Sequence, residues 1–147
     1  MAQSAEIKYS VVEGWEQLPK GWAHRDVAGV AVDGEDRVFL ICRGDHPVLI
    51  YDRQGNFQRS WGEGEFSYRT HGIYVAPNGS IFCTDDGNHT VRQFTPEATA
   101  PGSFAAPHGL ALDSKNDLYV SEVTWTFAVS RGRVAEDCHT FQKFSLK

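Results

Sequence analysis

The segment VAGVAVD at residues 27–33 occurs in two further copies, as THGIYVA at residues 70–76 and as PHGLALD at residues 107–113. The glycines of the three copies stand 43 and 37 residues apart. In each copy, a second apolar run starts nine residues after the glycine. A repeat of this length is typical of the blades of a β-propeller. The repeat therefore predicts the architecture, although it does not name a function.

The residues around each copy have the chemistry of β-strands. Their apolar runs are rich in Val, Ile, Phe and Tyr, are separated by Asp, Asn and Gly turns, and show no helical period over ten residues. We therefore predict an all-β fold with three NHL-type propeller blades per chain, that is, half a propeller. The runs that follow the three copies are VFLIC at 38–42 and PVLIYD at 47–52, IFCT at 81–84 and TVRQFT at 90–95, and LYVS at 118–121 and TFQKF at 140–144.

We predict that residues 1–147 form one domain, and these runs mark its blades. Only the first repeat is followed by a recognisable outer strand, because EATAPGS at residues 97–103 has little strand propensity. The third run of the last repeat comes thirteen residues late, which indicates an inserted loop. We predict blade one at 24–62, blade two at 68–96, a linker at 97–106, blade three at 107–147 with an inserted loop at 126–139, and an outer strand at 7–15 that closes the last blade.

Three blades do not close a ring, since closed propellers have about four to eight. An open arc would leave an apolar blade face uncovered on each side. We therefore predict a homodimer that forms one six-bladed propeller, in which residues 7–15 of each chain complete the third blade of the partner. The alternative is a monomer in which residues 97–103 and the 126–139 loop cover the two faces.

The composition narrows the classes of partner. The net charge is −5 and the 14 basic residues are scattered, which disfavours a nucleic-acid surface. No apolar stretch approaches the roughly 20 residues of a membrane span, and the first residues do not resemble a signal peptide, so we expect a cytoplasmic protein. Cys42, Cys83 and Cys138 have no metal-type spacing and indicate buried thiols rather than a disulfide.

Parts of the repeats resemble known families. GVAVD at 29–33, GLALD at 109–113 and DGNHTVRQF at 86–94 resemble NHL repeats, which are the units of six-bladed propellers. More narrowly, RGDH at 43–46, YRTHG at 68–72 and PHGL at 107–110 are similar to segments of peptidyl-hydroxyglycine amidating lyases and their uncharacterised bacterial relatives.

In that lyase family, histidines of His-Gly or His-Ser turns hold a zinc ion in the central channel, and an arginine of an Arg-Gly segment acts nearby. The resemblance therefore implies zinc as a cofactor at His71 and His108, with Arg43 as a catalytic residue. The family's catalytic tyrosine and third zinc histidine have no match in this sequence. The chain resembles the first two blades and the last blade of such a protein, with the middle blades missing.

The residues themselves support a site at the same place. His71 and His108 directly precede the repeat glycine, where side chains of a propeller face the channel, whereas the first repeat has Ala28 there. A six-bladed ring of two chains would carry four such imidazoles, a donor type that zinc accepts. The alternative is that each histidine only bonds to neighbouring backbone.

Further polar residues precede or follow the strands at this mouth. Arg43 could hold a carboxylate or an oxyanion, or form a salt bridge to Asp85 or Glu122. We predict that Arg25, Tyr68 and Arg69 contribute to ligand binding at the same mouth.

Two functions follow from these observations. The first is a non-catalytic binding or assembly module that holds a small molecule or a peptide at the channel mouth. The alternative is a metal-dependent lyase or hydrolase that uses zinc, His71, His108 and Arg43. Whether the chain is an enzyme stays open at this point, because propellers serve binding and catalysis alike.

Overall fold

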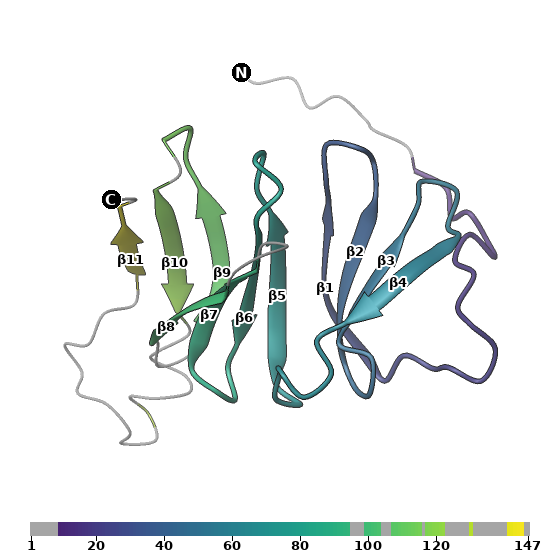
Figure 1. Cartoon of the computed structure of the whole chain (residues 1–147), viewed down its shortest axis with the longest axis horizontal. Coiled ribbons are helices and arrows are strands. Elements are labelled where there is room, and N and C mark those ends of the chain that lie inside the picture. The colour runs from purple at the N-terminus through teal and green to yellow at the C-terminus, as the bar shows by residue number, and fades with distance from the viewer. Residues whose placement is uncertain are drawn as a thin grey trace.

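The computed structural model of this chain describes residues 9–94, 99–103, 107–115, 117–122, 130 and 141–145. Within these residues the strands form three antiparallel sheets. Figure 1 shows the sheets standing side by side in chain order, like adjacent blades. The prediction of an all-β fold is confirmed, and the three copies of the repeat are the strands β1, β5 and β9.

The three sheets are named blades one, two and three. Blade one has the strand order β1-β2-β3-β4, blade two β5-β6-β7-β8, and blade three β11-β10-β9. The strands are β1 Asp26–Val32, β2 Val38–Arg43, β3 Val48–Tyr51, β4 Phe57–Trp61, β5 Thr70–Val75, β6 Ile81–Asp85, β7 Thr90–Phe94, β8 Thr99–Ser103, β9 Pro107–Leu112, β10 Leu118–Glu122 and β11 Phe141–Phe144.

The predicted linker at 97–106 is wrong in part, because it contains the strand β8. This strand pairs with β7 along its whole length, from Thr90 opposite Ser103 to Phe94 opposite Thr99. Pro101 is compatible with β8 because this strand lies at the edge of the sheet, where proline occurs in β-sheets. The free edge of β7 thus recruits a strand that side-chain propensity does not indicate.

The segment that leads into blade one has no strand at residues 9–15, and residues 7–8 lie outside the described part. It packs instead against blade one of its own chain. The Trp15 ring lies 6.0 Å from the Tyr51 ring, and Trp15 Nε1 donates to the Arg53 carbonyl at 3.0 Å. Gln17 forms a parallel bridge with Asn56. Pairing of this segment with the third blade of a partner stays a prediction.

Apolar clusters join neighbouring blades. Residues of β2 and β3 pack on residues of β5, β6 and β7, and a second cluster joins blade two to Val120 of blade three. A third cluster lies on the other face of blade one, under Trp15, Leu18 and Trp22. The first cluster consists of Phe39, Ile41, Val48, Ile50, Ile73, Val75, Cys83 and Phe94.

The repeat glycines allow the inner strands to approach closely. A Cβ atom on Gly29 would lie 3.3 Å from the Gly72 Cα and 3.3 Å from the His71 carbonyl oxygen. A Cβ atom on Gly72 would lie 3.4 Å from the His108 carbonyl oxygen. Each glycine therefore makes room for the backbone of the next inner strand, which places the two histidines at one end of adjacent strands.

The described residues include no helix with the length and apolar character of a membrane span.

Candidate functional site

The site is built around two histidines of adjacent blades. His71 of β5 and His108 of β9 have ring centroids 4.2 Å apart and ring planes inclined by 50°. They border a cavity of about 330 Å³, and its walls are formed by residues 28–30, 71–73 and 108–110. The structure thus brings together the two histidines that the sequence singles out, although they come from different repeats.

The surroundings of His71 favour its neutral form. Burial lowers the pKa of His71, and the nearby His108 and Arg43 lower it further. A neutral imidazole keeps one lone pair and one N–H, so it can accept one hydrogen bond and donate another, or bind a metal ion.

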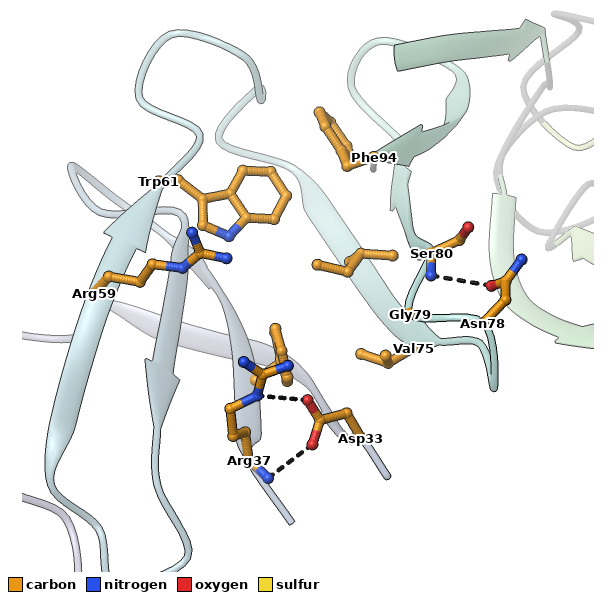
Figure 2. A pocket seen from close by; sticks show the side chains of 11 residues that line it. Asp33, Arg37, Arg59, Trp61, Val75, Asn78, Gly79, Ser80 and Phe94 are labelled. Carbon is orange, nitrogen blue, oxygen red and sulfur yellow. Dashed lines mark hydrogen bonds and ion pairs between the residues drawn. The ribbon is translucent and has the colours of Figure 1, made fainter. Parts of the chain in front are cut away.

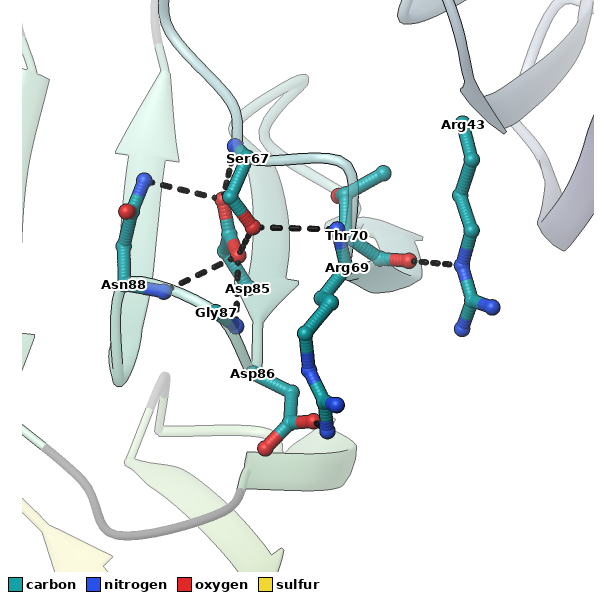
Figure 3. A network of polar contacts seen from close by, with 8 residues as sticks. All are labelled: Arg43, Ser67, Arg69, Thr70, Asp85, Asp86, Gly87 and Asn88. Atoms are coloured by element: carbon teal, nitrogen blue, oxygen red, sulfur yellow. Dashed lines mark hydrogen bonds and ion pairs between the residues drawn. The ribbon is translucent and has the colours of Figure 1, made fainter.

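Arg43 is fixed at the end of β2, beside this pair. Its Nε donates to the Thr70 carbonyl at 3.2 Å, and its nearest carboxylate is Asp26, with Nη1 to Oδ2 at 3.9 Å. The predicted alternative of a salt bridge to Asp85 is wrong, because that carboxylate is held by other donors (Figure 3). Arg43 therefore crosses from blade one to the first residue of β5 and helps to join the two blades.

Asp85 anchors the segment that enters β5. It is completely buried and accepts hydrogen bonds from the Ser67 N–H at 2.6 Å, the Gly87 N–H at 2.9 Å and the Asn88 side chain at 3.1 Å. The Ser67 hydroxyl also donates to it. Figure 3 shows these donors converging on one carboxylate. This network fixes the positions from which Tyr68 and Arg69 project.

The ion pairs at the entrances of the first two inner strands have opposite polarity. In blade one, Asp26 precedes the repeat and Arg43 stands across from it. At the matching positions of blade two, Arg69 precedes the repeat and forms an ion pair with Asp86. Blade one has Arg43 at the position where blade two has Asp86. This difference arises because the acidic and the basic residue of the ion pair have exchanged places between the two blades.

The predicted ligand residues Arg25, Tyr68 and Arg69 do not line the histidine cavity, and neither does Arg43. The side chain of Tyr68 is exposed, while Arg69 is engaged by Asp86. The methylene groups of Arg25 lie along Gly44.

Sequence reasoning missed a partly buried Cys–His–Glu arrangement beside blade one. Cys42 Sγ lies 3.7 Å from His24 Nδ1, and His24 Nε2 lies 2.6 Å from a Glu16 carboxylate oxygen. Burial, with a contribution from Glu16, raises the pKa of the Cys42 thiol to about 11, so the thiol stays protonated and is a poor nucleophile. His24 and Cys42 occupy the positions that Ser67 and Asp85 occupy in blade two. Their contact therefore anchors the strand entrance, and the repeat alignment was the signal that could have found it.

The described residues of one chain do not supply a complete zinc site beside His71 and His108. A catalytic zinc site uses three protein ligands, and this mouth offers His71 and His108. In the described part of the chain, no group of three or more His, Cys, Asp or Glu side chains is arranged to hold a metal ion.

No family model matches this chain. The chain is 27% identical over 123 residues to the peptidylglycine alpha-amidating monooxygenase of Rattus norvegicus, a match that covers 74% of the chain and 11% of that protein. It is 28% identical over 97 residues to peptidyl-glycine alpha-amidating monooxygenase B of Xenopus laevis, covering 66% of the chain and 10% of that protein. The chain thus spans about a tenth of these relatives and has weak homology to them.

Among solved structures, a streptogramin B lyase matches with a TM-score of 0.62 and 12% identity, covering 86% of this chain and 42% of that one. The chain thus spans less than half of that structure. The solved structures that this chain resembles are propeller-like proteins, which supports a β-propeller fold for this chain.

Proposed function

We propose that this chain is a non-catalytic propeller module that binds a small molecule or a peptide end at the mouth formed by His71 and His108. The observation that carries this proposal is the pair of imidazoles from adjacent blades, 4.2 Å apart over a cavity of about 330 Å³. Such a pair can donate and accept hydrogen bonds to one polar group. Arg43 adds a positive charge at the rim, which favours a carboxylate on the ligand.

The experiment is a titration of the full chain with triglycine and with triglycinamide, followed by the histidine ring signals in NMR. We expect the His71 and His108 signals to respond to triglycine more strongly than to its amide. His108→Ala should abolish the response of His71. His89→Asn serves as the control, because His89 has a positive φ of 54° that asparagine tolerates. Signals that do not move in the wild-type chain would contradict the proposal.

We further propose that a second copy of the chain completes the ring. Val30 and Val32 on β1 are 61% and 54% exposed, whereas their counterparts on β5, Ile73 and Val75, are each 9% exposed because blade one covers them. At the other end, Phe141 of β11 is 60% exposed, while its counterpart Val91 of β7 is buried. Both open faces are thus of the kind that pack together inside the chain.

Blade three of a second copy is the occupant that suits the open face of β1, because blade-to-blade packing already joins blades one, two and three. The ring would be six-bladed and its mouth would carry four histidines. Native mass spectrometry should then give twice the chain mass of 16.4 kDa. The double variant Val30→Glu, Val32→Glu should be monomeric, while the exposed turn variant Gln54→Glu should stay dimeric. A monomeric wild-type chain would contradict this part of the proposal.

A second function, a metal-dependent lyase or hydrolase, is favoured by the similarity to the amidating enzymes together with the paired histidines. In a dimer, His71 and His108 of both chains would provide the imidazoles, and a bound zinc ion would supply an acidified water molecule. Calorimetric titration with zinc tests this. Binding that is lost in His71→Ala and in His108→Ala, but kept in His89→Asn, would favour this function over the non-catalytic one.

A further inference from the structure

A second cavity lies between blades one and two, at the end of the inner strands away from His71 and His108. Its volume is about 570 Å³, within the range of small-molecule sites. Figure 2 shows that its walls come from the turns after β1 and β5 and from strands β4 and β7. Nothing in the proposed function uses this cavity.

The cavity carries one positive charge that is not compensated. Arg37 is neutralised by Asp33, with Nε to Oδ2 at 2.7 Å. The side chain of Arg59 of β4, by contrast, has no hydrogen bond or ion pair with any other residue of the described part, and it lines the cavity. With two arginines and one aspartate in the lining, the net charge is about +1 at neutral pH.

A second donor lies beside this guanidinium. Trp61 follows Arg59 by two residues on β4, so both side chains are on the same face of the strand. Its ring packs on Phe94 with centroids 4.8 Å apart, and its indole N–H has no acceptor among the described residues. In Figure 2 the Arg59 guanidinium extends towards the Trp61 ring.

The other wall of the cavity is apolar. It is formed by one side chain from each of the strands β2, β5, β6 and β7, and these side chains belong to or pack against the cluster that joins blades one and two. They are Phe39, Val75, Ile81 and Phe94.

We propose that this cavity binds an organic monocarboxylate whose apolar body lies against Phe94 and Val75. The planar guanidinium of Arg59 suits the two oxygens of a carboxylate, and the Trp61 N–H offers one further bond to the same group. One uncompensated positive charge is balanced by one negative charge. A phosphate dianion would bring an excess of negative charge close to Asp33.

The test uses matched pairs of acid and amide, phenylacetate against phenylacetamide and hexanoate against hexanamide, in calorimetric titrations of the full chain. We expect each acid to bind about 10- to 100-fold more tightly than its amide, the effect of one charge-assisted hydrogen-bond pair. Arg59→Gln should reduce the affinity for the acids by a similar factor. Trp61→Phe keeps the ring packing and removes the N–H, so its effect should be smaller than that of Arg59→Gln.

The control is Arg53→Gln, which removes an exposed arginine near the same strand that does not line the cavity. Its affinity for the acids should equal that of the wild type. The double variant His71→Ala, His108→Ala should also bind the acids normally, which separates this site from the channel mouth. Acids that bind no better than their amides, that do not bind at all, or that bind Arg59→Gln as well as the wild type would overturn the proposal.

Discussion

Blades one and two follow the same plan, and they differ in what covers them and what anchors them. The face of β5 that packs against blade one is buried, whereas the matching face of β1 is exposed at Val30 and Val32. The entrance to β5 is held by a buried carboxylate, Asp85, whereas the entrance to β1 is held by a thiol, Cys42. The same backbone repeat is therefore compatible with different stabilising side chains. Substitutions at equivalent positions of the two blades can then be compared to measure what each side chain contributes.

The largest expected difference concerns the covered and the open faces. Ile73→Asp should lower the free energy of unfolding by about 4 kcal/mol or more, because it places an unpaired charge between two blades. Val30→Asp should lower it by less than about 1 kcal/mol in a monomer, because its site is exposed. Urea unfolding of both variants at low protein concentration measures the difference. Equal losses would show that the face of β1 is covered in the monomer.

The two anchors at the strand entrances should differ next. Asp85→Ala should cost about 2–4 kcal/mol, because the Ser67, Gly87 and Asn88 donors would lose a buried acceptor. Cys42→Ala should cost about 1 kcal/mol, since it removes a small buried group with one weak contact. Thermal unfolding of both variants checks this order. A Cys42→Ala variant as unstable as Asp85→Ala would mean that the His24 contact carries more energy than its geometry indicates.

The repeat glycines give a smaller contrast. Gly29→Ala should lower the free energy of unfolding by about 1–3 kcal/mol, because its Cβ would press on the backbone of Gly72 and His71. Gly109→Ala should cost less, since the nearest atom is the Ser121 hydroxyl at 2.9 Å, which a side-chain rotation can move. Chemical unfolding of the two alanine variants tests whether backbone contact is the reason for these glycines.

The smallest effect is the titration of His71. Because burial and the neighbouring cations lower its pKa, protonation favours the unfolded chain, and stability should fall as the pH drops below about 6.5, the ordinary value. NMR titration should place the His71 midpoint below that value, and Arg43→Gln should raise it. If the His71 midpoint does not change in Arg43→Gln, the charge of Arg43 does not act on His71, which would contradict this prediction.

The inner strands were predictable because their signal is both local and repeated: apolar alternation, a glycine and a turn recur in each blade. The strand β8 was not, since its residues have little strand propensity and it is recognised by its pairing with β7. The nearness of His71 and His108 followed from the repeat, because equivalent positions of the inner strands β5 and β9 lie side by side. The cavity lined by Arg59 and Trp61 was missed, because it joins non-equivalent parts of two blades and has no periodic pattern.

The packing of Trp15, Leu18 and Trp22 on blade one bears on the order in which a nascent chain folds. A chain leaves the ribosome N-terminus first, so its N-terminal part can fold before the rest is made. When β4 has left the ribosome, blade one already holds its own cover over Tyr51 and Cys42, while Val30 and Val32 on the same face stay exposed. The opposite face, with Phe39 and Ile41, has to wait for β5 to β7. We therefore expect the growing chain to present this apolar face to other chains until β5 to β7 have been translated.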